Sequence, residues 1–183
     1  MQPRKKVLTI SGSTRQQSAN LNLLKAIAIL FDADFEFTFF SGLSLLPHFN
    51  PDDDNENPPL NVVAFRKMVR EAEAVLICTP EYAMGLPGTL KNALDWTVSS
   101  SDFSDKPVAV ITASTSGEKA HASLIGTLKV IEAVTNEDIQ LLIPFISSKV
   151  SNSNIITDQT TLQEVKNLMN NFSRLLHTPA AES

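Results

Sequence analysis

The chain has 183 residues, of which 43% are apolar and 19% charged, and these values are typical of one globular domain. Its formal charge of −5 argues against a nucleic-acid-binding protein, which would carry a basic face. No apolar stretch approaches the roughly 20 residues of a membrane span. The single cysteine, Cys78, excludes an intrachain disulfide and a cysteine zinc site. We therefore expect one cytoplasmic domain over residues 1–183, with neither membrane nor nucleic acid as a partner.

The N-terminal part of the chain predicts a strand, a helix and a second strand. Lys6–Ile10 is a β-branched run that stops at a Ser-Gly pair, which is typical of a buried strand. Apolar residues recur at helical spacing over residues 21–31, and Ser18 or Asn20 can cap that helix. Phe35–Phe39 alternates aromatic and polar residues, which predicts a strand at or near an edge of the sheet.

The middle of the chain begins with a segment unlike its neighbours. Residues 41–59 are rich in proline and contain the run Asp52–Asp54, so we expect a long surface loop whose carboxylates are solvated. Leu60–Ala72 is helical by spacing, and Ala74–Cys78 is an apolar strand. A helix from about Pro87 to Val98 follows.

The C-terminal part continues the alternation of strands and helices. Val108–Thr112 and Ile139–Ile146 are predicted strands, the latter interrupted near a proline. Lys119–Ala133 and an amphipathic stretch over residues 162–175 are predicted helices. Strands separated by helices imply a parallel sheet covered on both faces, and five such strands suggest the order 2-1-3-4-5. Ligands are then expected at the carboxyl ends of the first and third strands.

The loop after the first strand offers an anion site. Ser13, Arg15, Ser18 and Asn20 place hydroxyls, a guanidinium and an amide ahead of a helix N-terminus, where free N–H groups and the helix dipole favour negative charge. The loop lacks the glycines of a dinucleotide fingerprint and the GK[ST] of a P-loop, which disfavours tightly held NAD and ATP. A monophosphate matches better. The alternative is that these residues only cap the helix and fill a turn.

The loop after the third strand carries a second motif. It continues into the next predicted helix and reads Pro80-Glu81-Tyr82-Ala83-Met84-Gly85-Leu86-Pro87-Gly88-Thr89-Leu90-Lys91-Asn92. This motif and the loop Gly12–Asn20, which matches G-S-x-R-x-x-S-x-N at every defined position, resemble those of the NADPH-dependent FMN reductase family. That family is a flavodoxin-like group that includes quinone, azo-dye and chromate reductases. The resemblance runs from about Lys6 to Leu124.

The resemblance implies a flavodoxin-like three-layer αβα sandwich that binds FMN. The implied cofactor-binding residues are Ser13, Arg15, Ser18, Ala19, Asn20, Pro80, Glu81, Tyr82, Ala83, Met84, Ser114, Thr115 and Gly117. The chain departs from the family pattern where the flavin ring would lie. Ala83 stands where the family has Asn, Met84 where glycine is common, and Gly117-Glu118 where a double glycine is common.

The implied activity is hydride transfer from NADPH or NADH through FMN to a small acceptor: a quinone, free flavin, azo compound or metal oxyanion. The flavin carries the chemistry, so no catalytic side chain and no metal are assigned, and ping-pong binding is expected. Helices over residues 86–98 and 119–133 resemble those used for self-association, which implies a homodimer or homotetramer. The alternatives are a flavodoxin-type electron carrier and a non-catalytic module that lost the cofactor.

A few further residues have mainly structural interpretations. Cys78 ends an apolar strand and is expected to be an inert buried thiol. Glu81 is expected to act structurally, either by capping a helix or by pairing with Lys91 or Arg66. Trp96 is expected in the core or at a subunit interface.

Overall fold

The computed structural model describes residues 3–15 and 17–178, and that part of the chain forms a parallel sheet in the order β2-β1-β3-β4-β5. The strands are β1 (Lys5–Ser11), β2 (Phe35–Phe40), β3 (Ala74–Thr79), β4 (Val108–Ser114) and β5 (Gln140–Pro144). The sequence-based strand order is confirmed. Because β2 lies at the edge and β1 beside β3, the order reverses between β1 and β3.

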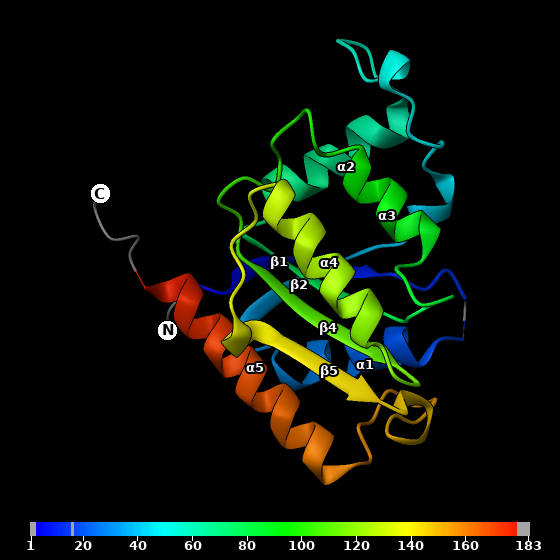
Figure 1. Cartoon of the computed structure of the whole chain (residues 1–183). Helices are drawn as coiled ribbons and strands as arrows, with labels where there is room; N and C mark the ends of the chain where they lie inside the picture. Colours follow the sequence, from blue (N-terminus) through cyan, green and yellow to red (C-terminus); the bar gives the residue numbers. More distant parts are fainter. Residues whose placement is uncertain (1–2, 16, 179–183) are drawn as a thin grey trace.

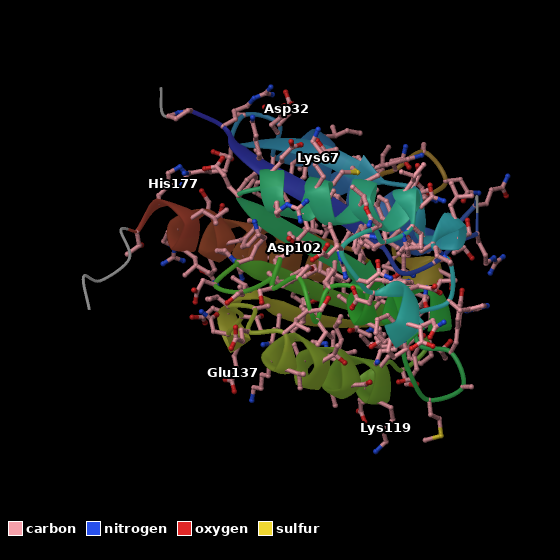
Figure 2. All side chains as sticks on the ribbon, turned by 90° about the horizontal axis from the view of Figure 1, so that it is seen from above. Asp32, Lys67, Asp102, Lys119, Glu137 and His177 are labelled. Atoms are coloured by element: carbon pink, nitrogen blue, oxygen red, sulfur yellow. The ribbon has the colours of Figure 1, made fainter. Side chains whose placement is uncertain are left out.

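Helices cover both faces of the sheet and complete three layers (Figure 1). They are α1 (Ala19–Leu30), α2 (Leu60–Glu71), α3 (Gly88–Asp95), α4 (Glu118–Val130) and α5 (Gln159–His177). Packing contacts place α1 and α5 on one face and α2, α3 and α4 on the other. Figure 2 shows Lys119 at the start of α4 and Glu137 beyond its other end, so α4 begins at the edge where the strands end.

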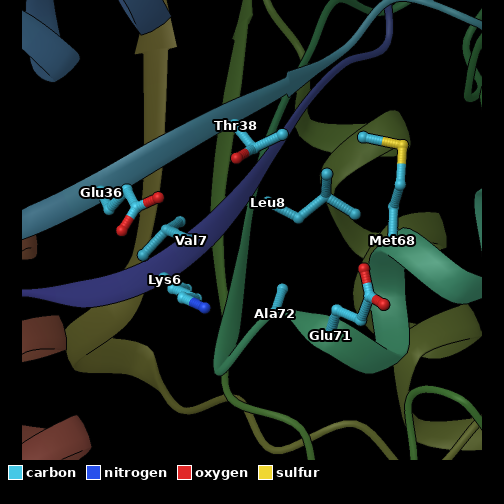
Figure 3. A pocket seen from close by; sticks show the side chains of 8 residues that line it. All are labelled: Lys6, Val7, Leu8, Glu36, Thr38, Met68, Glu71 and Ala72. Atoms are coloured by element: carbon cyan, nitrogen blue, oxygen red, sulfur yellow. The ribbon is translucent and has the colours of Figure 1, made fainter.

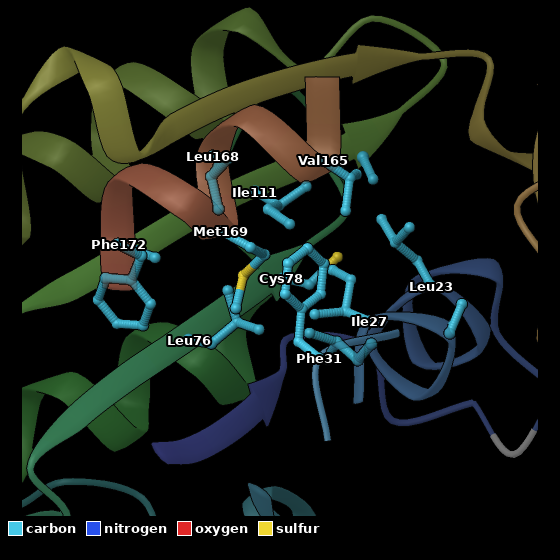
Figure 4. Packing of buried hydrophobic residues seen from close by; sticks show 14 of the residues in the cluster. Leu23, Ile27, Phe31, Leu76, Cys78, Ile111, Val165, Leu168, Met169 and Phe172 are labelled. Atoms are coloured by element: carbon cyan, nitrogen blue, oxygen red, sulfur yellow. The ribbon is translucent and has the colours of Figure 1, made fainter. Parts of the chain in front are cut away.

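The central strands are apolar because both of their faces are covered. Every residue of β3 is buried. Leu76 and Cys78 pack with α1 and α5 (Figure 4), whereas Val75 and Ile77 pack with the opposite helices. Burying one large aliphatic side chain stabilises the folded state by about 1.5–3 kcal/mol. Because each face of the sheet buries many such side chains, the strands and the loops at their ends have fixed positions.

Several predicted boundaries differ from those observed. The helix α3 ends at Asp95 rather than near Val98, and α4 ends at Val130 rather than at Ala133. The strand β5 ends at Pro144, because proline has no N–H to continue the ladder. The prediction that residues 41–59 hold no regular element is wrong in detail, since they contain the short 3₁₀ helices η1 (Leu43–Leu45) and η2 (Pro51–Asp53).

The acidic loop is tied to the helical layer through one of its carboxylates. Asp54 accepts a hydrogen bond from Arg66 at 2.7 Å, and both side chains are buried. Burial raises the pKa of Asp54, but hydrogen bonds from Arg66 and Ser99 outweigh it, so the pKa is lowered overall. Arg66 also donates to the carbonyl of Trp96, a fully buried core residue. The expectation of solvated carboxylates is therefore wrong for Asp54.

No helix in residues 3–15 and 17–178 is both long and apolar enough to cross a membrane.

Candidate functional site

The loop after β1 begins at Gly12, which lies in close contact with the end of β3. The N–H of Gly12 donates to the carbonyl of Cys78 at 2.8 Å. A Cβ at Gly12 would lie 2.3 Å from Oγ1 of Thr79, a separation at which atoms clash. Only glycine allows the first-strand loop to begin here, and this contact fixes the loop beside the end of β3.

Among the residues that the structure describes, the start of α1 gathers hydrogen-bond donors without a partner. Ser13 and Ser18 are 8% and 6% exposed, and Ser18 occupies the N-cap position without a side-chain cap bond. The first backbone bond of the helix runs from Asn22 to Ser18, so the N–H groups of residues 19–21 have no helical acceptor. Arg15 lies exposed in the same loop. Two buried hydroxyls, free N–H groups and a guanidinium at the positive end of a helix form a site suited to a phosphate.

Asn20 connects this loop to the two neighbouring strand ends. Its Nδ2 donates to the carbonyl of Ala113 at 3.0 Å, and its Oδ1 accepts from Sγ of Cys78 at 3.1 Å. Burial raises the pKa of the Cys78 thiol well above its ordinary range, so the thiol stays protonated and can donate. The expectation that Cys78 is buried and inert agrees with this arrangement. Asn20 therefore joins α1 to β3 and β4.

The loop after β3 contains a tight turn at the positions where the chain departs from the family pattern. Tyr82 and Gly85 exchange two backbone hydrogen bonds of 3.0 Å each. The residues between them, Ala83 and Met84, have φ angles of 47° and 61°, the left-handed pattern of a type I′ turn. Asn-Gly is the favoured pair for such a turn. The type I′ turn thus forms here although its two central residues disfavour a left-handed backbone.

Glu81 connects the loop after β3 to the start of α4. Its carboxylate accepts from the N–H of Ala120 at 2.9 Å and from Oγ of Ser116 at 3.2 Å, and its own N–H donates to Oγ of Ser114 at 3.2 Å. The Ala120 bond, the largest contribution, lowers the pKa of Glu81. The N-cap residue of α4, Gly117, has a φ of 103° and no side chain to cap with. Glu81 supplies that cap, as its predicted structural role requires.

The other partners considered for Glu81 are engaged elsewhere. Lys91 pairs with Asp95 one helical turn away, and Arg66 pairs with Asp54. Helix capping is therefore the structural role that Glu81 performs.

A cavity of about 350 Å³ lies at the carboxyl ends of the strands, between the loops that follow β1, β3 and β4. Its volume falls in the range of small-ligand sites, about 300–1,000 Å³. It brings together most of the predicted site residues: Ser13, Arg15, Ser18, Ala19, Asn20, Pro80, Tyr82, Ser114 and Thr115. Glu81, Ala83, Met84 and Gly117 do not line it. Glu81 and Gly117 instead shape the start of α4, and Ala83 and Met84 form the turn after Tyr82.

The cavity also has a wall that the sequence reasoning missed. This wall follows β5 and includes Phe145, Ile146, Ser147, Val150 and Asn152. Phe145 has a φ of 55°, which is rare for a bulky residue, and strained residues of this kind cluster at functional sites. The predicted topology could have indicated this wall, because the fifth strand ends at the same edge as the other four.

A larger cavity, about 520 Å³, lies elsewhere, against β1, β2 and α2 (Figure 3). Its lining includes the carboxylates Glu36 and Glu71, which would repel a phosphate, and neither sequence motif reaches it. In the described ranges no group of three or more His, Cys, Asp and Glu side chains is placed to hold a metal ion. The cavity at the strand ends remains the candidate site.

A sheet of this order with a phosphate-suited loop at its reversal point defines a flavodoxin-like nucleotide-binding protein. Residues 5–147 match the NADPH-dependent FMN reductase family model. The chain therefore belongs to the NADPH-dependent FMN reductase family, and it is an oxidoreductase that uses FMN and NAD(P)H.

Individual relatives agree with this assignment. A 2-hydroxy-1,4-benzoquinone reductase from Burkholderia sp is 33% identical over 162 residues, covering 85% of this chain and 87% of that protein. A quinone reductase from Escherichia coli K12 is 27% identical over 183 residues, with 96% and 97% covered. Among solved structures, FerB, the NAD(P)H:(acceptor) oxidoreductase from Paracoccus denitrificans, superposes with a TM-score of 0.84 at 28% identity, covering 94% of this chain and 97% of that one.

Proposed function

We propose that this chain transfers hydride from NADPH or NADH through bound FMN to a small quinone, with donor and acceptor using one site in turn. The observation that carries the proposal is the single cavity that joins the phosphate-suited loop to the loops after β3 and β4. The names of the 33% and 27% identical relatives favour a quinone over a free flavin, an azo compound or a metal oxyanion.

The FMN phosphate would lie at the start of α1. The hydroxyls of Ser13 and Ser18 would donate to it, together with the free N–H groups of residues 19–21, while Arg15 would approach from the solvent side. Hydrogen bonds to a charged group contribute about 1.5–3 kcal/mol each. Asn20 would line the site with its amide still bonded to Ala113, and would hold the loop in position.

The flavin ring would lie between the loops after β3 and β4. Pro80 and Tyr82 would form one side, and Ser114 and Thr115 the other. Glu81 would support the ring site indirectly, because its hydrogen bonds to Ser114 and to the start of α4 hold the two loops together.

The remaining proposed residues would act through the backbone and by apolar contact. Ala83 and Met84 lie just outside the cavity in the turn after Tyr82, and would meet a ring edge that protrudes from it. Met84 is largely exposed there and can contact an arriving substrate. Gly117 would let the loop after β4 pack closely against Leu142, since a Cβ at this position would lie 2.9 Å from a methyl group of that residue.

When bound, FMN supplies the redox chemistry, accepting hydride from the nicotinamide and passing two electrons to the acceptor. The protein's part is to hold and orient. Tyr82 and Phe145 are 46% and 62% exposed and line the same cavity, so their rings can stack on a planar donor or acceptor at its open side.

Steady-state kinetics with NADPH and 1,4-benzoquinone test the shared site. Because donor and acceptor use the same place in turn, double-reciprocal plots at several quinone concentrations should give parallel lines. Intersecting lines would mean that both bind together and would contradict the proposal. Repeating the series with NADH and with free FMN, an azo dye and chromate as acceptors ranks the donors and acceptors.

We also propose a cytoplasmic homodimer or homotetramer, in which α3 and α4 take part in self-association. Val98 follows α3 and Val130 ends α4, and both are exposed apolar residues. Light scattering of the purified holoprotein gives the mass, and a monomer at micromolar concentration would contradict this part of the proposal.

A further inference from the structure

A second cavity, about 250 Å³, adjoins the proposed FMN site. It lies between the loop after β1 and the end of β2, and Ser13 and Arg15 line both cavities. The two cavities therefore meet at the residues proposed to hold the FMN phosphate. The volume of the second cavity is below the range of sites that hold a whole small ligand. It suits one part of a ligand whose other part lies in the first cavity.

The walls of this second cavity are mainly apolar. Phe39, which is 37% exposed, and Phe40 come from the end of β2, Leu21 from α1 and Leu43 from η1. Ser41 and Ser44 add hydroxyls at the same end of the sheet. This combination suits a flat heteroaromatic ring that carries a sugar, because the ring can lie against the aromatic side chain and the hydroxyls can meet its polar edge.

The charges at the second cavity point to a ligand with phosphates. Arg15 is exposed, and none of the ion pairs within residues 3–15 and 17–178 involves it. The described lining contains no Asp or Glu, in contrast to the larger cavity beside β1 and α2. A guanidinium with no competing carboxylate beside a hydroxyl loop favours a phosphate at the junction of the two cavities.

We propose that the second cavity binds the adenosine half of a dinucleotide whose phosphates lie beside the loop that carries Ser13 and Arg15. This inference rests on the proposed FMN site, from which the ligand would extend past the phosphate loop. Two dinucleotides carry this chemistry. FAD would place its FMN half in the first cavity, whereas NAD(P)H would place its nicotinamide over the flavin and its adenosine beyond the phosphate.

The first experiment compares FMN and FAD binding to flavin-free protein by flavin fluorescence. The variant Phe39→Ser removes the aromatic wall of the second cavity. Ser44→Phe blocks the same cavity by adding volume from an exposed position. Leu60→Ser is the matched control, because Leu60 is 85% exposed on α2 and lines neither cavity. FMN binding should be unchanged in all three variants, which also shows that they fold.

Losing the stacking of a base on an aromatic side chain should weaken binding by about fivefold to a hundredfold. If FAD is the ligand, Phe39→Ser and Ser44→Phe raise its dissociation constant by about this factor and Leu60→Ser does not. If NAD(P)H is the ligand, the same two variants raise its KM. The KM of reduced nicotinamide mononucleotide, which lacks adenosine, stays unchanged.

The proposal is overturned if both variants leave FAD binding and the NADH and NADPH KM values within twofold of wild type while FMN still binds. Wild-type protein that fails to bind FMN at all would overturn the proposed function itself, and with it this inference. The two failures are therefore distinguishable in the same titration.

Discussion

The carboxylate of Glu81 and the backbone N–H of Ala120 are 2.9 Å apart, so a residue of the loop after β3 caps the helix that follows β4. The two loops proposed to enclose the flavin ring are thus joined by a hydrogen bond that does not involve the flavin. Since Gly117 at the N-cap has no side chain, the start of α4 depends on Glu81 for this contact.

Replacing Glu81 with glutamine should lower the melting temperature at neutral pH. The hydrogen bond from Ala120 holds the pKa of Glu81 below its ordinary value of 4.5, so the ionised carboxylate stabilises the fold above that pH. This contribution is lost as the pH falls through the lowered pKa. The difference in melting temperature between wild type and Glu81→Gln should therefore be present at pH 7 and shrink as the pH falls below 4.5. Thermal unfolding followed by circular dichroism measures it.

Glu164→Gln is the control for that comparison, because Glu164 is exposed on α5 and takes part in no ion pair among the described residues. It should match wild type throughout. A Glu81→Gln difference that is independent of pH would count against the capping role.

The turn between Tyr82 and Gly85 should become more stable when its central residues favour a left-handed backbone. Ala83 has a φ of 47°, and a left-handed conformation costs an ordinary residue about 1–2 kcal/mol. Because asparagine tolerates it better, Ala83→Asn should raise the free energy of unfolding by about 0.5–1 kcal/mol. Ala83→Val, with a branched Cβ, should lower it. Urea unfolding gives both values, and equal stability of the two variants would refute the strain argument.

Removing one hydroxyl from the loop after β1 should weaken FMN binding without changing the fold. Ser18→Ala deletes a buried donor proposed to meet the phosphate, and the loss of about 1.5–3 kcal/mol corresponds to a tenfold to hundredfold rise in the dissociation constant. Thr14→Ala is the control, since Thr14 is an exposed hydroxyl of the same loop outside the FMN cavity. Equal FMN affinities for the two variants would place the phosphate elsewhere.

Gly12 should not tolerate a larger side chain. In Gly12→Ala the added methyl would clash with Thr79 at 2.3 Å, and such overpacking costs about 1–3 kcal/mol. Gly126 provides the opposite case, because a Cβ there meets nothing within 4 Å in the middle of α4. Gly126→Ala should therefore stabilise the protein by about 0.5–1 kcal/mol. Denaturant unfolding of the pair should give changes of opposite sign, and changes of the same sign would contradict the packing argument.

Much of the fold could be predicted from the sequence because its determinants are local. Apolar runs such as Ala74–Cys78, separated by helical spacings, are enough to give a parallel sheet and its order. The alternation of Phe35–Phe39 correctly placed that strand at an edge. The cavity at the ends of the strands likewise follows from topology once the order is known.

The parts that could not be predicted depend on contacts between distant segments. Glu81 caps Ala120, which lies far from it in sequence, and pairing with Lys91 or Arg66 was equally open to it. Asp54 was expected to be solvated, because nothing in the loop sequence indicates its pairing with Arg66 on the following helix. The role of Ala83 was also hidden. The sequence shows only that Ala83 replaces the asparagine of the family pattern, whereas the backbone shows that the position demands a left-handed residue.

The central claim is that this chain passes electrons from NAD(P)H through FMN to a quinone, and the visible absorbance of the FMN-loaded protein tests it most directly. Under anaerobic conditions, one equivalent of NADPH or NADH should bleach the flavin band rapidly. Adding 1,4-benzoquinone should then restore it within the time of one catalytic cycle. A flavin that neither donor bleaches, or a bleached flavin that the quinone does not reoxidise, would contradict the account.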